Sequence, residues 1–117
     1  MTSEELKDRT KRFAARIVKY VDSLPRRISI DVIARQLVKS GTSIGANYRA
    51  SCLARSKAEF LSKPQIVYEE SDECVYWLDV LKDSGHANAE DHDALRAEAL
   101  ELTKIFASSL KTARSSS

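Results

Sequence analysis

The sequence predicts an all-α protein, an up-down antiparallel four-helix bundle. Apolar residues recur at steps of three and four along four segments joined by short connections, which is the pattern of amphipathic helices in a bundle. The 117 residues include only three glycines and two prolines, too few for the many turns of an all-β protein. This length indicates one domain with a single core. We expect the bundle to span residues 1–113, with a frayed tail at 114–117.

The first helix is predicted to begin at a capping box formed by Thr2 and Glu5. Pro25 ends it, because proline disfavours the helical conformation in the preceding residue. Its apolar stripe consists of Leu6, Phe13, Ile17, Tyr20, Val21 and Leu24.

The second helix is expected from Ser29 or Ile30 to Arg55, and it is unusual in carrying glycines on its apolar stripe. Gly41 and Gly45 would each cost roughly 1 kcal/mol relative to alanine in a helix interior. A neighbouring helix packed unusually close would compensate for this cost. The alternative is a loop over residues 40–47 that divides two shorter helices. The stripe consists of Ile30, Ile33, Ala34, Leu37, Val38, Gly41, Ile44, Gly45 and Tyr48.

The third helix is predicted from Lys57 to Ser84, between a capping box of Ser56 and Glu59 and a C′ glycine at Gly85. Its stripe consists of Phe60, Pro64, Val67, Ser71, Cys74, Leu78 and Leu81. Two helices joined so tightly run antiparallel, so the numbers of facing residues should sum to about 111. The predicted facing pairs are Gly41 with Glu70, Gly45 with Ile66 and Val67, Leu37 with Cys74, and Ala34 with Trp77.

The fourth helix is expected after a turn, with Asn88 as its N-cap and Asp91 in its first turn. Its stripe consists of Leu95, Ala99, Leu102, Phe106, Leu110 and Ala113.

Three stretches together carry a family resemblance: S-G-T-S-I-G-A-N-Y-R-A, R-S-K-A-E-F and E-E-S-D-E-C-V-Y-W-L. From about Phe13 to Gly85 the chain resembles the bacterial intervening-sequence proteins, which are encoded within inserts in large-subunit ribosomal RNA genes. That family is similar to the accessory variability proteins of diversity-generating retroelements, which bind nucleic acid and a reverse transcriptase. The resemblance implies a four-helix bundle in a homopentameric ring without established enzymatic activity. The structural positions within these stretches are Gly41, Gly45, Asn47, Arg49, Glu70, Glu73 and Trp77.

Charge is distributed unevenly along the chain, although the net charge is only +2. Residues 1–57 hold thirteen Lys and Arg against five Asp and Glu, whereas residues 58–117 hold six against twelve. Cations aligned along a helix can neutralise phosphates, so RNA or DNA is a candidate partner. The alternatives are a solvated face or a contact with the acidic half of a neighbouring subunit. The candidate nucleic-acid contacts are Arg9, Arg12, Arg16, Lys19, Arg26 and Arg27.

The sequence offers no catalytic, cofactor or metal motif. His86 and His92 are six residues apart, a spacing that does not place two ligands on one helix face, so we interpret them as surface histidines. The run Glu69, Glu70, Asp72 and Glu73 lacks the Glu-x-x-His pairs of di-iron bundles. We expect instead a salt-bridged seam in which Arg35 and Lys39 face Glu73 and Asp72.

Pro64 and the two cysteines lead to local predictions. Pro64 leaves the Phe60 carbonyl without its helix donor, and Asn47 or Ser51 on the facing helix could supply one. Cys52 and Cys74 should lie roughly 20 Å apart along the bundle, so we expect both to be reduced packing residues.

The N-terminus is polar and acidic and no long apolar run follows, which favours a cytoplasmic protein. We expect a non-enzymatic oligomeric adaptor that binds nucleic acid through its first two helices. The alternative is a structural or regulatory scaffold that has protein partners only.

Overall fold

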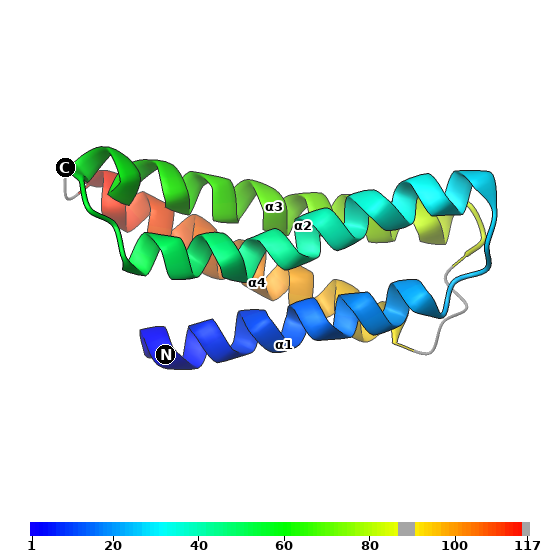
Figure 1. Cartoon of the computed structure of the whole chain (residues 1–117). Coiled ribbons are helices and arrows are strands. Elements are labelled where there is room, and N and C mark those ends of the chain that lie inside the picture. Colours follow the sequence, from blue (N-terminus) through cyan, green and yellow to red (C-terminus); the bar gives the residue numbers. More distant parts are fainter. Residues whose placement is uncertain (87–90, 116–117) are drawn as a thin grey trace.

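The computed structural model describes residues 1–86 and 91–115, and it confirms an all-α, up-down four-helix bundle (Figure 1). The helices are α1 (Ser3–Asp22), α2 (Ile28–Cys52), α3 (Lys57–Asp83) and α4 (His92–Ser115). α2 packs against α1 and α3, α3 also packs against α4, and α1 makes a smaller contact with α4. α1 begins and α4 ends at the same end of the bundle. None of the helices in the described residues is long and apolar enough to cross a membrane.

The helix ends follow the predicted capping chemistry. The Thr2 hydroxyl accepts from the Glu5 N–H at 3.1 Å, and the Ser56 hydroxyl accepts from the Glu59 N–H at 3.2 Å. At the far end of α3, Gly85 adopts φ +86°, and the His86 N–H donates to the Leu81 carbonyl at 2.7 Å. This geometry is a Schellman cap, which explains the glycine.

Several helix boundaries differ from the sequence prediction, most of all at the end of α2 and at both ends of α4. α2 is continuous through residues 40–47, which excludes the loop alternative, but it ends at Cys52 rather than at Arg55. α4 begins at His92; the predicted N-cap Asn88 lies outside the described residues, and Asp91 precedes the first turn instead of lying in it. α4 continues to Ser115, two residues past the expected domain end, and Arg114 donates to the Gln65 side chain at 2.5 Å.

The predicted stripes form the core with one clear exception, Phe60, whose side chain is 49% exposed. The core also contains polar residues that the stripes did not include: Thr10, Ser40 and His92 are buried. The Thr10 and Ser40 hydroxyls donate to carbonyls one turn earlier in their own helices, so burial leaves neither of them unpaired. The fully buried centre consists of Ile17, Leu37, Ile44, Val67, Cys74, Leu78, Leu81, Leu95, Ala99 and Leu102.

The two glycines of α2 do allow a close helix approach, but the helix they approach is α1. A Cβ at Gly41 would lie 2.9 Å from Cγ2 of Ile17, and one at Gly45 would lie 3.1 Å from Oγ1 of Thr10. The atoms nearest to these two Cβ positions thus belong to α1, and not to the Glu70, Ile66 and Val67 predicted on α3. The cause is that α2 packs on two helices at once, and its glycines lie on the α1 side.

The α2–α3 register is close to the predicted one. The Cys74 thiol donates to the Ser40 hydroxyl at 3.4 Å, so Cys74 meets Ser40 rather than Leu37, three residues away. Cys74 is a buried packing residue as expected, and burial raises the pKa of its thiol to about 12. Cys52 is exposed at the end of α2, so its assignment as a packing residue is wrong.

Pro64 lies inside α3 without ending it. The predicted donors to the Phe60 carbonyl have other partners within α2. The Asn47 amide donates to the Ser43 carbonyl at 2.9 Å, and the Ser51 hydroxyl donates to the Tyr48 carbonyl at 2.7 Å. Both side chains lie within reach of their own helix backbone, which satisfies them locally.

Candidate nucleic-acid interface

Two of the predicted contacts, Arg9 and Arg16, lie on the side of α1 that faces α4. The Arg9 guanidinium donates two hydrogen bonds, of 2.7 and 2.6 Å, to the Glu98 carboxylate, and both side chains are half-buried. The hydrogen bond to Glu98 raises the pKa of Arg9. Arg16 donates to Asp91 at 3.1 Å. These two arginines join α1 to α4 and are already matched by carboxylates of the same chain.

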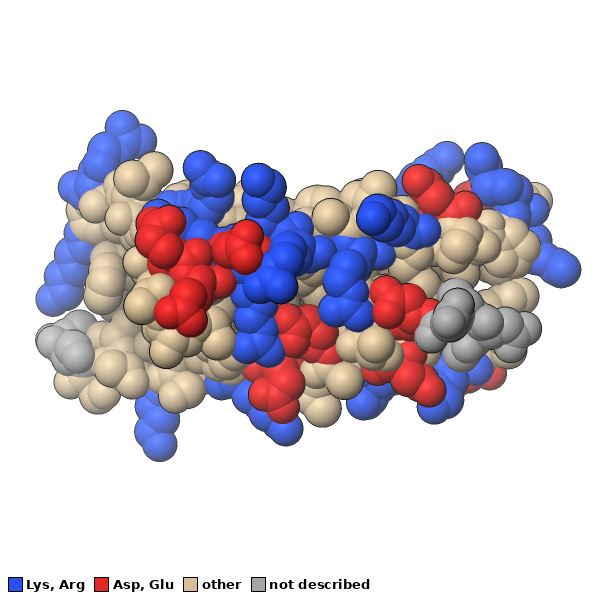
Figure 2. Space-filling view, turned by 90° about the horizontal axis from the view of Figure 1, so that it is seen from below, with Lys and Arg blue, Asp and Glu red and all other residues tan. Residues whose placement is uncertain are grey.

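The outward side of α1 carries exposed cations. Arg12 and Lys19 were predicted contacts, and Lys11 joins them as an exposed neighbour. Arg12 pairs with Asp8 at 2.9 Å, but both side chains are more than half exposed, so the pair contributes only about 0–1 kcal/mol. Lys11 and Lys19 have no ion-pair partner in the part of the chain that the structure describes. Figure 2 shows the face of the molecule that includes α1, where acidic groups lie among the basic ones.

The connection between α1 and α2 holds the last two predicted contacts. Arg26 pairs with Asp31 at 3.0 Å, which ties the connection to the first turn of α2. Arg27 is exposed at the N-cap position of α2, and its side chain makes no capping hydrogen bond. The six predicted residues therefore do not form one continuous patch of unpaired charge.

The expected salt-bridged seam between α2 and α3 does not form. No ion pair within 4.0 Å joins Arg35 or Lys39 to Glu73 or Asp72 in the described residues. Glu73 accepts instead from the Trp77 indole at 3.1 Å. Ser40 and Cys74 occupy the contact between the helices. Arg35 and Lys39 are exposed on α2 and line the groove beside α1.

This shift reveals cations that sequence reasoning had assigned to the seam. Arg35 and Lys39 are exposed one turn apart on α2. Arg49, which was not assigned to the seam, is exposed fourteen residues beyond Arg35, close to the same face. The helical period was a sufficient signal for this face. The sequence prediction missed it because it paired Arg35 and Lys39 with the acidic run on α3.

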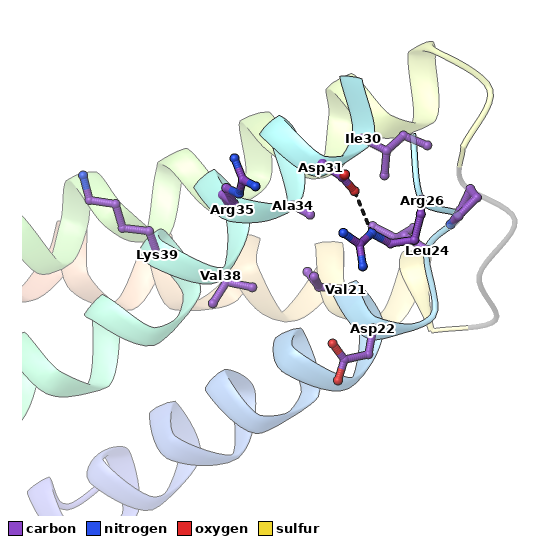
Figure 3. A pocket seen from close by; sticks show the side chains of 11 residues that line it. Val21, Asp22, Leu24, Arg26, Ile30, Asp31, Ala34, Arg35, Val38 and Lys39 are labelled. Atoms are coloured by element: carbon purple, nitrogen blue, oxygen red, sulfur yellow. Dashed lines mark hydrogen bonds and ion pairs between the residues drawn. The ribbon is translucent and has the colours of Figure 1, made fainter. Parts of the chain in front are cut away.

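A groove of about 460 Å³ lies between the end of α1 and the start of α2 (Figure 3). We call it the α1–α2 groove. Val21 from α1 and Val38 from α2 point into it, with Ala34 beside them. Arg35 and Lys39 stand along its α2 side, and the Arg26–Asp31 pair closes its end at the connection. Asp22 lies on the α1 side of the groove, so the groove suits a partner that places an apolar group on its floor and negative charge against the cations of α2.

Glu70 and Tyr20 each keep a buried polar side-chain atom without a hydrogen-bond partner among the described residues. The atom of Glu70 is Oε2. Burial, together with the neighbouring carboxylate of Glu73, raises the pKa of Glu70, and the charge of Lys39 opposes this shift.

His92 is buried, so its interpretation as a surface histidine is wrong. Its Nε2 atom lies 2.8 Å from the Leu78 carbonyl and therefore donates to it. Its ring packs against Tyr20, with 5.9 Å between the ring centroids. His86 is half-buried at the end of α3. No three His, Cys, Asp or Glu side chains of residues 1–86 and 91–115 converge as metal ligands would.

The fold and surface define a class: a small helical bundle with a charged outer surface and an apolar groove between α1 and α2. Residues 4–108 match the family model described as 23S rRNA-intervening sequence protein. The chain belongs to this family. A solved structure of a protein of unknown function from the S23 ribosomal protein family of Bacteroides thetaiotaomicron is 33% identical, with a TM-score of 0.83. The match covers 95% of this chain and 99% of that one. A search of curated proteins found no match.

Proposed function

We propose that this protein is a non-enzymatic cytoplasmic adaptor that assembles into a homopentameric ring and binds RNA or DNA. The observation that carries the nucleic-acid part is the exposure of Lys11, Arg12 and Lys19 on the outward side of α1, away from the carboxylates of α4. Cations on one helix face can neutralise successive phosphates, which supplies most of the affinity in sequence-independent binding. Arg27 and Arg49 extend the exposed charge onto α2.

The assembly part of the proposal rests on what the bundle leaves exposed. Large apolar side chains remain at the surface: Val18, Ile28, Val32, Leu53, Phe60 and Tyr76. These are the contact residues we favour. The large aromatic side chains of Tyr48 and Trp77 pack instead against the core of their own chain. The opposite charge of the two halves of the chain suits a head-to-tail contact, and such a contact closes into a ring when the rotation permits. The resemblance described above supports five subunits.

The second candidate function is a scaffold with protein partners only. The α1–α2 groove favours it, because an apolar floor serves a protein contact and adds nothing to phosphate binding.

Retention on immobilised single-stranded RNA at low and high salt separates the two candidates. The wild type should be retained at low salt and released at high salt. The variant carrying Lys11→Glu, Arg12→Glu and Lys19→Glu should lose retention, because these positions are exposed and the bundle does not depend on them.

A matched control carries Lys82→Glu, Lys104→Glu and Lys111→Glu on α3 and α4, the same change in charge on exposed positions. It should remain bound. If only the α1 variant loses retention, the binding involves its three cations. Loss of three phosphate contacts should reduce the slope of log K against log salt concentration by about 2. Absence of wild-type retention at low salt, or equal loss in both variants, would reject the nucleic-acid proposal and leave the scaffold function.

A further inference from the structure

The outward side of α3 carries a line of exposed acidic residues around one aromatic side chain. Glu69, Asp72, Tyr76 and Asp83 lie at steps of three, four and seven, so they share one helix face. Tyr76 is 58% exposed, and its ring rests edge-on against Trp77, with 4.9 Å between the centroids and 74° between the ring planes. An exposed ring between carboxylates is the counterpart of an apolar groove with cations on its rim.

These two features cannot meet within one molecule. The groove is lined by α1, the connection and α2, whereas Tyr76 projects from α3, which does not pack against α1. Only another copy of the chain can bring this α3 face to the groove.

The α2–α3 register places the two features at the same height along the bundle. Ser40 and Cys74 are in contact, and the helices are antiparallel, so Tyr76 is level with Val38 in the groove. Asp79 is level with Arg35 by the same count, but its carboxylate already accepts from Arg96 of α4 at 2.6 Å. Asp72 lies about 4.5 Å along the axis from the level of Lys39, within reach of a lysine side chain. A rotation about an axis parallel to the bundle keeps these heights.

We propose that Tyr76 of one copy inserts into the α1–α2 groove of the next copy, with Asp72 against Lys39. This proposal rests on the homo-oligomer proposed above and specifies its contact. The contact is heterologous, since each copy offers its α3 face on one side and its groove on another. It covers Arg35 and Lys39 but leaves the cations on the outward side of α1 exposed for nucleic acid.

The mass in solution of two complementary variants tests this contact. Tyr76→Arg removes the inserted ring and leaves the groove intact, whereas Ala34→Trp fills the groove and leaves Tyr76 intact. Each variant alone should have the mass of one 13.1 kDa chain. An equimolar mixture should form one-to-one dimers and nothing larger, because one intact groove and one intact Tyr76 remain.

Charge reversal gives a second test that does not depend on filling the groove. Lys39→Glu alone and Asp72→Lys alone should each weaken assembly about tenfold or more, and the double variant should recover the wild-type mass. Arg49→Glu is the control, because Arg49 lies on the same face of α2 but does not line the groove.

The outcomes separate this contact from the proposal on which it rests. A wild-type oligomer whose mass persists in Tyr76→Arg and in Lys39→Glu overturns the contact and leaves the oligomer standing. A wild-type monomer overturns both.

Discussion

Gly41 shows why α2 tolerates a glycine in its interior. The side chain that would meet a Cβ there is Ile17, which is fully buried and β-branched and therefore cannot swing aside. Gly41→Leu should destabilise the fold by about 1–3 kcal/mol or more, measured by thermal or urea unfolding. Ala46→Leu, on the exposed side of the same helix, is the control and should change stability by less than about 0.5 kcal/mol. Equal stability of the two variants would contradict close packing of α2 on α1.

Glu70 gives a prediction about pH. Its pKa is raised in the folded protein, mainly by burial, so folding favours the neutral carboxyl. The stability contributed by this preference is complete below the pKa of Glu70 in the unfolded chain, and it is lost as pH rises through the folded pKa. Glu70→Gln should therefore raise the melting temperature at pH 7 and change it little at acidic pH.

Asp83→Asn is the control for this effect, because Asp83 is exposed on the same helix and is not among the charges that shift the pKa of Glu70. A Glu70→Gln protein that is less stable than the wild type at pH 7 would show that the carboxylate has a favourable partner in solution.

The core residues show what a sequence reveals at this scale. Apolar positions such as Leu37, Leu78 and Leu102 follow from periodicity, because burial of one helix face is the main stabilising term. His92 does not follow from periodicity. Its burial depends on the Leu78 carbonyl and the Tyr20 ring, which the fold brings to it from other helices.

At the scale of the element, helix ends were the most predictable feature. The capping boxes at Thr2 and Ser56 and the cap at Gly85 depend on neighbouring residues alone, and the structure contains all three. The partner of each helix face was less predictable. α2 has two neighbours, and the sequence pattern does not tell which of them Gly41 approaches. The candidate interface was mispredicted for the same reason. Arg9 and Arg16 lie on the side of α1 that faces α4, and no local pattern on α1 predicts their ion pairs with Glu98 and Asp91.

Pro64 provides the prediction that belongs to α3. A proline in a helix interior removes one backbone hydrogen bond and crowds the preceding turn, at a cost of about 3 kcal/mol. Pro64→Ala restores the donor to the Phe60 carbonyl, so the variant should unfold at a higher temperature. Ser62→Ala, two residues away and exposed, serves as the control for helix propensity alone. A lower melting temperature for Pro64→Ala would mean that the fold or the assembly requires the altered turn.

At the scale of the whole molecule, the positively charged side chains of α1 and α2 fall into three groups. Arg9 and Arg16 hold α1 to α4, Arg35 and Lys39 border the α1–α2 groove, and the cations on the outward side of α1 face solvent. The sequence predicted the excess of positive charge in the first half of the chain. Its division among these groups depends on which helices pack together, and so it required the fold. Each group has a different expected role: bundle stability, assembly and nucleic-acid binding.

The most direct test of the central claim is the mass in solution, by light scattering, of the wild type mixed with a short single-stranded RNA. We predict a complex of five 13.1 kDa chains with RNA at about 0.1 M salt. At about 1 M salt, where the Debye length falls to about 3 Å, the RNA should leave and the apolar contacts should keep the protein oligomeric. A single-chain mass at both salt concentrations, with RNA eluting alone, would contradict the account.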